Sequence, residues 1–346
     1  MEIVRKTLKE ARLGAPRAHA NLAVFPLWTA APADRPYMTL DEALSSGRVR
    51  VTEVSQDGSV PDLCVVNDAD RPVLLLDGEE LRGAKQNRVL NLTILAPAGK
   101  TIFVPVACVE QGRWADLSAA FASSDHLLYS RSRAAKAAAV TASLGLSGRA
   151  LSDQGAVWAS IHEKMDRLGT PSATSAMEDI FRARREGIDE FVAALRPEPE
   201  QTGAVFALNG SVAGLELFDH PDALAATFPK LVRSWALDAI EDAPQEVSAP
   251  PIEAAQAFLE IVADAEMQSF DAVGQGTDVR LRAAEVSGGA VVDGGRVSPG
   301  PFSTGGFRPP RESWIVRASR RLVRRPSGVP GDDSISRHRR TRGGGG

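Results

Sequence analysis

Residues 74–95 read LLLDGEELRGAKQNRVLNLTIL, and this stretch organises the N-terminal part of the chain. Apolar runs typical of strands flank a core from Asp77 to Arg88, in which eight of twelve side chains are acidic, basic or amide. Two such runs around a glycine-containing segment predict a β-hairpin over residues 72–95, with its tip near Gly83.

The polar core of this hairpin is unusual for a loop. A plain hairpin loop needs turn residues, and it does not need this mixture of charges and amides. We therefore predict that the core forms the lip of a binding site. The alternative is a solvated turn in which Lys85 pairs with Glu79 or Glu80, a contact that contributes under about 1 kcal/mol when exposed.

Short strands are predicted on both sides of the hairpin. Apolar, partly β-branched segments alternate with Gly, Pro, Asp and Asn turns. The motif Thr39-Leu-Asp-Glu42 is a capping box, and it predicts a short helix that ends at Gly47. The predicted strands cover residues 21–28, 49–54, 60–67, 72–76, 88–95 and 100–109.

The pattern changes at about residue 131, where apolar residues take helical spacing. Asn209-Gly210 lies between two apolar runs and predicts a hairpin over residues 202–218. The predicted helices cover residues 131–143, 153–168, 175–195, 221–241 and 251–266, and residues 278–297 are expected to add a last strand pair.

These elements predict an α+β fold. An antiparallel β-rich part, residues 1–130, carries the polar motifs. A mainly helical part with a small C-terminal β-hairpin/helix element, residues 131–297, is expected to pack on it as one domain. Residues 298–346 have too few periodic apolar positions to fold alone and are predicted to be a disordered tail.

Composition limits the class of protein. The chain has 346 residues, 43% hydrophobic and 24% charged, as in ordinary globular proteins. Residues 281–346 hold 13 Arg and 5 acidic residues, a balance of +8, whereas residues 1–280 hold 27 basic and 39 acidic residues, a balance of −12. An acidic body argues against a broad nucleic-acid-binding face. The arginine-rich tail also resembles a GC-rich gene read in a shifted frame.

The chain start lacks the apolar region of a signal peptide, and no run reaches the length of a membrane span. Cys64 and Cys108 provide neither a disulfide framework nor a CxxC metal pair. We therefore expect a cytoplasmic protein without a membrane partner. The sequence does not determine its oligomeric state.

Two segments carry the candidate chemistry, and each follows an apolar strand. The first is Asp77–Arg88, extended to Asn91, and the second is Cys108–Trp114. Functional side chains at the ends of neighbouring strands converge at low entropic cost. The pooled candidates are the acids Asp77, Glu79, Glu80 and Glu110; the cations Arg82, Lys85, Arg88 and Arg113; the amides Gln86, Asn87, Asn91 and Gln111; and Cys108 and Trp114.

Other signals for chemistry are weak. Gly99-Lys100-Thr101 lacks the earlier glycine of a phosphate-binding loop. The five histidines are scattered without metal-ligand spacing, so no residue is assigned to a metal, although the carboxylates could hold Mg²⁺. Cys108 is more typical of a small buried hydrophobe than of a nucleophile. Trp114 suits packing as well as stacking, and Glu216 is functional only if its side chain faces inward.

The segments GEELRGAKQNR and CVEQGRW resemble those of the ADP-ribosylglycohydrolase- and rhodanese-phosphatase-associated protein domain family. The likeness also includes NLAVFPL, VTEVSQDGSVPDL, GLELFD and FPKLVRSWALDAIED, and it covers residues 10–297. It implies an enzyme or ligand-binding role linked to ADP-ribose metabolism. The chain departs from the family after GAVVDGGRV, where a His and apolar residues are expected and SPGPFSTGG stands instead. The positions that match the family pattern are Asp77, Glu79, Glu80, Lys85, Gln86, Asn87, Arg88, Asn91, Cys108, Glu110, Gln111, Arg113 and Trp114.

We predict an enzyme that acts on a phosphate-bearing small molecule of the ADP-ribose type. Glu79 or Glu80 would be the general base, and Lys85 would stabilise developing charge. Arg88 and Arg113 would hold anionic groups, and the amides would orient a sugar or base. Two alternatives use the same segments: a ligand sensor without catalysis, and an interface module of an oligomer.

Overall fold

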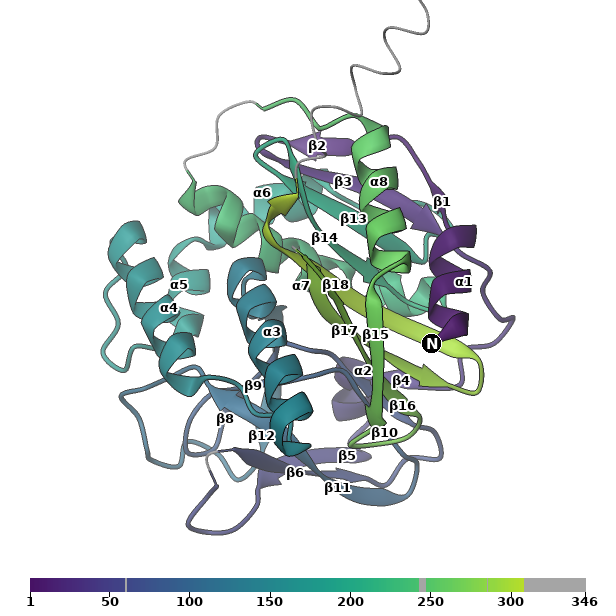
Figure 1. The fold of residues 1–346 in the computed structure, drawn as a ribbon. Coiled ribbons are helices and arrows are strands. Elements are labelled where there is room, and N and C mark those ends of the chain that lie inside the picture. The colour runs from purple at the N-terminus through teal and green to yellow at the C-terminus, as the bar shows by residue number, and fades with distance from the viewer. Residues whose placement is uncertain (60, 243–246, 285, 308–346) are drawn as a thin grey trace, which may run out of the picture. The chain divides into compact units, whose positions relative to one another are not determined.

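The computed structural model describes residues 1–59, 61–242, 247–284 and 286–307, and for residues 296–307 it describes the backbone. Met1–Arg308 form one compact unit. Helices and antiparallel sheets are both present, so the predicted α+β class is confirmed (Figure 1). The tail boundary predicted at residue 298 falls inside a strand, and the tail beyond residue 307 lies outside the described residues.

A six-stranded antiparallel sheet carries both polar motifs. Its order is β12-β8-β9-β11-β6-β5. The strands are β5 (Val49–Glu53), β6 (Asp62–Asn67), β8 (Glu79–Gly83), β9 (Arg88–Leu90), β11 (Lys100–Cys108) and β12 (Phe121–Leu127). Leu81, Leu90 and Val106 lie in one apolar cluster, which anchors this sheet.

A three-stranded sheet, in the order β10-β7-β4, packs into the same cluster. Its strands are β4 (Met38–Thr39), β7 (Val73–Leu75) and β10 (Ile94–Ala96). The helix α2 (Leu40–Ser45) begins with the predicted capping box, in which Thr39 and Glu42 bond each other reciprocally.

The predicted hairpin over residues 72–95 is two nested strand pairs in different sheets. β7 pairs with β10, and β8 pairs with β9. The single strand predicted for residues 88–95 is therefore wrong. At the break, Lys136 Nζ donates to the carbonyls of Leu90 and Asn91, and the Leu90 carbonyl also accepts the Gly78 N–H.

The largest sheet joins the two ends of the chain. Its order is β1-β3-β13-β14-β18-β17-β16-β15, with β2 on β3. The strands are β1 (Arg12–Leu13), β2 (Arg17–His19), β3 (Leu22–Trp28), β13 (Gly203–Leu208), β14 (Ser211–Leu217), β15 (Glu266–Asp271), β16 (Thr277–Ala283), β17 (Val286–Asp293) and β18 (Arg296–Phe307). The predicted hairpin at Asn209-Gly210 is confirmed, since both residues take the positive φ of such a turn, 52° and 72°.

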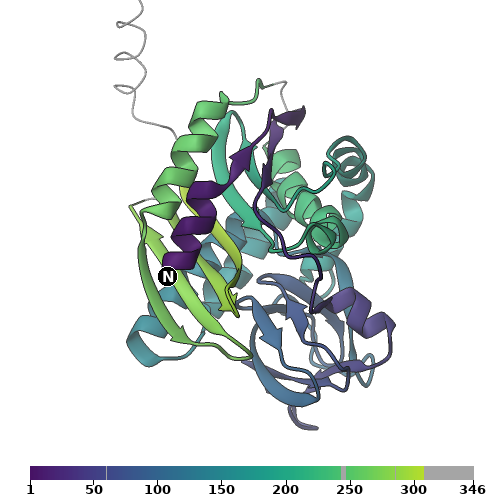
Figure 2. The ribbon, with the colours of Figure 1, turned by 90° about the vertical axis from the view of Figure 1, so that its right-hand side faces the viewer.

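Helices cover both faces of this sheet (Figures 1 and 2). α1 (Glu2–Glu10) and α8 (Ile252–Ala263) share an apolar cluster on one face. α3 (Ser130–Ser147) and α7 (Pro221–Glu241) share the cluster on the other face. The remaining helices are α4 (Gln154–Leu168), α5 (Met177–Ala183) and α6 (Arg185–Ala194).

The single helix predicted for residues 175–195 is divided into α5 and α6. Arg184 takes φ −110° and ψ 13° between them, and its guanidinium donates to the Leu168 carbonyl at the end of α4. The elements that were not predicted include α1, β12 and β15, and the short strands β1, β2 and β4. Among the described residues, no helix has the length and apolar character needed to cross a membrane.

Candidate functional site

The DGEE turn, residues 77–80, sends its three acidic side chains to three different elements. Gly78 takes a left-handed φ of +78°, and its N–H donates to the Leu90 carbonyl at 2.9 Å. An added Cβ there would lie 2.9 Å from the Arg133 side chain, so only glycine fits. The turn therefore connects three elements. Asp77 pairs with Lys136 of α3, Glu79 with Lys230 of α7, and Glu80 with His126 of β12.

Glu79 lies in a closed ion pair. Its Oε1 is 2.8 Å from Lys230 Nζ, which also bonds Asp41 at 2.7 Å and Ser123 at 2.8 Å. Its Oε2 accepts the Leu76 N–H at 3.2 Å. Burial alone would lower the pKa of Lys230, but the two carboxylates outweigh burial and raise it. Both oxygens of Glu79 are thus engaged.

Glu110 and Arg113 hold the tip of the hairpin, and with Asn87 and Thr174 they form what we call the Arg113 bracket. Arg113 Nη2 lies 2.5 Å from Glu110 Oε2 and 3.1 Å from Asn87 Oδ1. Thr174 Oγ1 donates to Glu110 Oε1 at 2.8 Å. Burial tends to raise the pKa of Glu110, but these hydrogen bonds and the Asn87 N–H lower it. Arg113 also donates to the carbonyls of Gly83, Ala84 and Ala115.

The remaining predicted residues have varied environments. Lys85 Nζ lies 3.4 Å from Asp116 instead of pairing with Glu79 or Glu80. Gln111 and Trp114 are exposed. The buried Asn91 side chain donates to the Ala150 carbonyl at 2.9 Å, and the backbone of the buried Cys108 forms two hydrogen bonds with the Gln154 side chain.

Arg88 is fully buried in β9. Its Nη1 donates to Gln86 Oε1 at 2.6 Å, and its Nε and Nη2 have no hydrogen-bond partner among the described residues. Its guanidinium lies 5.5 Å from the centroid of the Trp114 ring. Burial lowers the pKa of Arg88 and raises the pKa of the neighbouring Cys108 thiol. No exposed atom of Arg88 is available to a ligand in this conformation.

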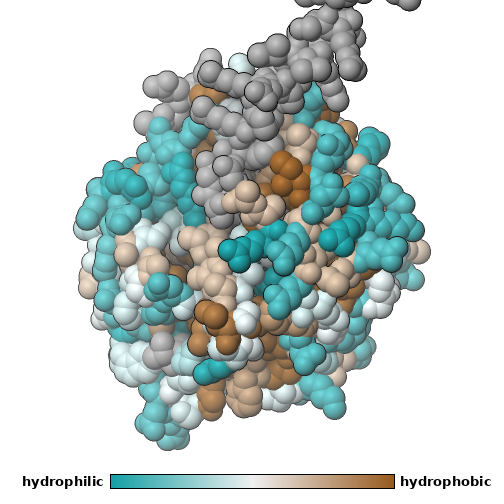
Figure 3. Space-filling model, in the orientation of Figure 1, coloured by the Kyte–Doolittle hydropathy of each residue, from teal (hydrophilic) through white to brown (hydrophobic). Residues whose placement is uncertain are grey.

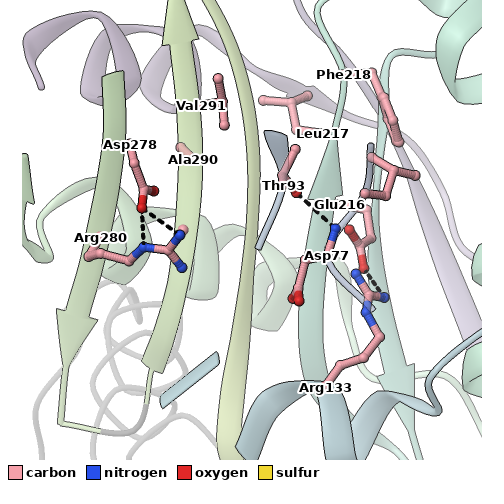
Figure 4. A pocket seen from close by; sticks show the side chains of 12 residues that line it. Asp77, Thr93, Arg133, Glu216, Leu217, Phe218, Asp278, Arg280, Ala290 and Val291 are labelled. Carbon is pink, nitrogen blue, oxygen red and sulfur yellow. Dashed lines mark hydrogen bonds and ion pairs between the residues drawn. The ribbon is translucent and has the colours of Figure 1, made fainter. Parts of the chain in front are cut away.

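Asp77 faces a recess between α3, β14, β16 and β17 (Figure 4). The recess contains about 470 Å³ of empty space, counted out to open solvent. Two buried ion pairs flank it: Arg133 with Glu216 at 2.6 Å, and Arg280 with Asp278 at 2.7 Å. Glu216 thus faces inward, which is the orientation that sequence analysis required for a functional role.

Two acids of the recess, Glu216 and Asp278, have pKa values shifted in the direction opposite to that of Glu110. Burial raises the pKa of Glu216, against the opposing effect of Arg133. Burial also raises the pKa of Asp278, against that of Arg280. Asp77 keeps 15% of its side-chain surface exposed and is the member of the DGEE turn that reaches this recess. A solvent-connected recess with such acids has the character of a ligand site.

A second cluster lies on the other side of β8, where Glu80 meets His126 of β12 and Glu178 of α5. His126 Nε2 is 2.5 Å from Glu80 Oε2 and 3.5 Å from Glu178 Oε2. The His126 ring stacks on Phe181, with centroids 3.7 Å apart. The burial of His126 disfavours its charge, but Glu80 and Asp125 outweigh this and raise its pKa.

Sequence analysis missed the residues that complete both clusters. The recess takes Arg133, Asp278 and Arg280 from segments with no motif of their own. The other cluster takes His126 from a strand that was not predicted. Glu216 was the one member outside the hairpin that carried a signal, as an acid alternating with apolar neighbours in GLELF.

Comparisons with known proteins give one family. Residues 10–298 match the model of the ARG and Rhodanese-Phosphatase-superfamily-associated Protein domain. No curated protein and no solved structure matches the chain. The match ends at residue 298, within the first residues of β18 and at the position where sequence analysis predicted a departure from the family pattern. Because the match covers most of the chain, the protein belongs to the ARG and Rhodanese-Phosphatase-superfamily-associated Protein domain family.

Proposed function

We propose that the protein is an enzyme that acts on a phosphate-bearing small molecule of the ADP-ribose type, bound at the recess. The observation that supports this most directly is the set of two buried arginines beside two carboxyl groups whose pKa values are raised. A water molecule can be centred in only about 20 Å³ of the recess, so a ligand of this size would need the surrounding side chains to move apart. The family name, which associates the domain with other proteins, is compatible with this substrate class.

Each group has a chemical role in this proposal. The planar guanidinium groups of Arg133 and Arg280 suit bidentate contacts with phosphate oxygens. A carboxyl group with a raised pKa keeps its proton to a higher pH than usual, so Glu216 or Asp278 would serve as general acid or base. Asp77, the more exposed acid, would bind a substrate hydroxyl or, with the other acids, a Mg²⁺ ion.

The roles proposed here differ from those expected from sequence. Glu79 is held by Lys230, which favours Glu216 over Glu79 as the base. The other matched positions, including Lys85 and the Arg113 bracket, would hold the hairpin that presents Asp77. The burial of Arg88 and Arg113 argues against the interface alternative, which needs them at the surface.

Ligand binding is tested by a thermal-shift panel with ADP-ribose, NAD, simple nucleotides and phosphosugars, with and without Mg²⁺. A ligand that binds only the folded state stabilises it by about 2.7 kcal/mol at 100 times its dissociation constant. We expect Arg280→Lys to reduce the shift and Lys85→Met to leave it unchanged. A shift lost in Lys85→Met and kept in Arg280→Lys would move the ligand to the hairpin tip.

Turnover separates an enzyme from a sensor. Any ligand from the panel is incubated with the wild type and Glu216→Gln, and its products are followed by chromatography. An enzyme loses turnover in this variant while binding persists. A sensor shows binding without products in either protein. Glu253→Gln, at an exposed position of α8, is the matched control.

We propose the cytoplasm as the compartment, in keeping with the free thiols of Cys64 and Cys108.

A further inference from the structure

We propose that Glu80, His126 and Glu178 bind a divalent first-row transition-metal ion. One ligand atom from each residue lies within 4.8 Å of the other two. Metal bonds of about 2.1 Å at tetrahedral angles place ligand atoms roughly 3.4 Å apart. Glu178 Oε2 is at 3.5 Å from His126 Nε2, and Glu80 Oε2 at 2.5 Å would move outward by roughly 1 Å.

Each carboxylate has one oxygen held by a donor and the other directed at the cluster. Asn87 Nδ2 donates to Glu80 Oε1 at 3.3 Å, and Arg82 Nη1 donates to Glu178 Oε1 at 2.9 Å. Both Oε2 atoms are buried: that of Glu178 has no hydrogen-bond partner among the described residues, and that of Glu80 has only His126 Nε2, at 2.5 Å. Glu80 is itself fully buried, so its Oε2 has no access to bulk water. A buried acceptor without a donor is costly, and a cation would satisfy both.

The imidazole is oriented as in a metal site. Asp125 Oδ1 lies 3.0 Å from His126 Nδ1, and Ser124 Oγ also lies 3.0 Å from it. A carboxylate on one ring nitrogen fixes the proton there and leaves the other nitrogen as the ligand. Phe181 stacks on the ring and holds its plane. His126 Nε2 is thereby directed at the Oε2 atoms of Glu80 and Glu178, and Ser124 Oγ lies 3.3 Å from it.

The competing reading is an imidazolium ion pair without metal. A proton on His126 Nε2 bonds one acceptor well, and Glu80 Oε2 at 2.5 Å would take it. Glu178 Oε2 at 3.5 Å would then remain without a donor among the described groups. A metal ion can bind Glu80 Oε2 and Glu178 Oε2 at once, which favours a metal site over the ion pair.

The donor set defines the class of ion. Two carboxylate oxygens and one imidazole nitrogen suit Zn²⁺, Mn²⁺ or Fe²⁺, whereas Mg²⁺ prefers oxygen ligands alone. Sites with three protein ligands usually keep a further position for water or substrate. Glu178 retains 21% side-chain exposure and Arg82 44%, so this edge of the cluster is open to solvent.

The test uses the full chain, stripped with a chelator and reloaded separately with Zn²⁺, Mn²⁺ and, without oxygen, Fe²⁺. After gel filtration, metal per protein is measured by mass spectrometry. We expect about one ion per chain for at least one metal. Glu178→Gln, which keeps the shape of a half-exposed side chain, should weaken binding at least tenfold. His126→Ala should abolish it. The matched controls are Glu186→Gln and His162→Ala at exposed positions, which should bind as the wild type does.

Cobalt gives a second readout that does not depend on stability. Co²⁺ bound at the cluster should absorb in the visible range, and the band should shift or vanish in Glu178→Gln. The proposal is overturned if the wild type retains none of the three metals. It is also overturned if Glu178→Gln retains metal like the wild type. Neither readout involves the substrate of the recess, so either proposal can fail without the other.

Discussion

The Arg113 bracket and the recess contain the same kinds of side chain, but their hydrogen bonding differs. In the bracket, Glu110 accepts from Arg113, Thr174 and the Asn87 N–H, and the pKa of Glu110 is lowered. In the recess, burial dominates, and the pKa of Glu216 is raised. A carboxylate with a full set of donors is stabilised as an anion and holds structure, whereas one dominated by burial remains ready to exchange a proton. Residue type alone therefore does not identify the site.

The largest effect is expected from the bracket. Arg113→Ala removes the donor to Glu110 and Asn87, to two carbonyls of the hairpin tip and to the Ala115 carbonyl. Breaking a buried ion pair from one side costs about 3–5 kcal/mol, so we expect a loss of this order in the free energy of unfolding, measured with urea. Arg149→Ala, at an exposed position, is the control. A loss below about 1 kcal/mol, typical of exposed ion pairs, would contradict a structural role.

A substitution in the recess should lower the catalytic activity. In Glu216→Gln the amide oxygen can still accept from Arg133, but the group no longer exchanges a proton. If Glu216 is the general acid or base, turnover should fall about 100-fold or more. The KM for the same substrate should change little, because the guanidinium groups remain. Equal turnover in the variant and the wild type would remove Glu216 from the mechanism.

The opposite pKa shifts predict opposite pH dependence of stability. Glu110, lowered from the usual 4.5, stabilises the fold above pH 4.5, and this contribution is lost as the pH falls through its folded pKa. Glu216, raised from 4.5, contributes fully below pH 4.5 and loses its contribution as the pH rises through its folded pKa. Arg133 and Asp77 are the charged groups that act on Glu216.

Urea unfolding measured from about pH 2.5 to pH 8 covers the range in which both contributions change. The advantage of the wild type over Glu110→Gln should shrink as the pH falls below 4.5. The wild type should lose stability relative to Glu216→Gln as the pH rises above 4.5. If the difference in unfolding free energy between wild type and variant changes with pH in the same direction for Glu110→Gln and Glu216→Gln, the two acids do not differ as described.

Local sequence signals predicted much of the fold. The capping box at Thr39 and the Asn209-Gly210 turn act within a few residues, and both were predicted correctly. The strand predicted over residues 88–95 is interrupted after Leu90, where Lys136, distant in sequence, donates to the carbonyls of Leu90 and Asn91. Tertiary contacts of this kind override a local apolar pattern.

Only part of each candidate site could be predicted from the sequence, because tertiary contacts assemble the rest. The DGEE turn identified Asp77 and Glu80, and each proved to be one member of a cluster. Their partners come from separate elements: Glu216 from β14, His126 from β12 and Glu178 from α5. No spacing rule connects residues that meet only when three elements pack together. The motif identified the acids, and packing of distant elements determined the partner of each.

The smallest effect is expected at Lys85, which belongs neither to the Arg113 bracket nor to the recess. Its ammonium group lies 3.4 Å from Asp116, whose side chain is 67% exposed. Lys85→Met keeps the aliphatic packing and removes the charge, so the free energy of unfolding should change by less than about 0.5 kcal/mol. Turnover of a recess substrate should also be unchanged. A large loss of turnover with normal stability would instead restore the role expected from sequence, in which Lys85 stabilises charge at the hairpin tip, and would place the reaction outside the recess.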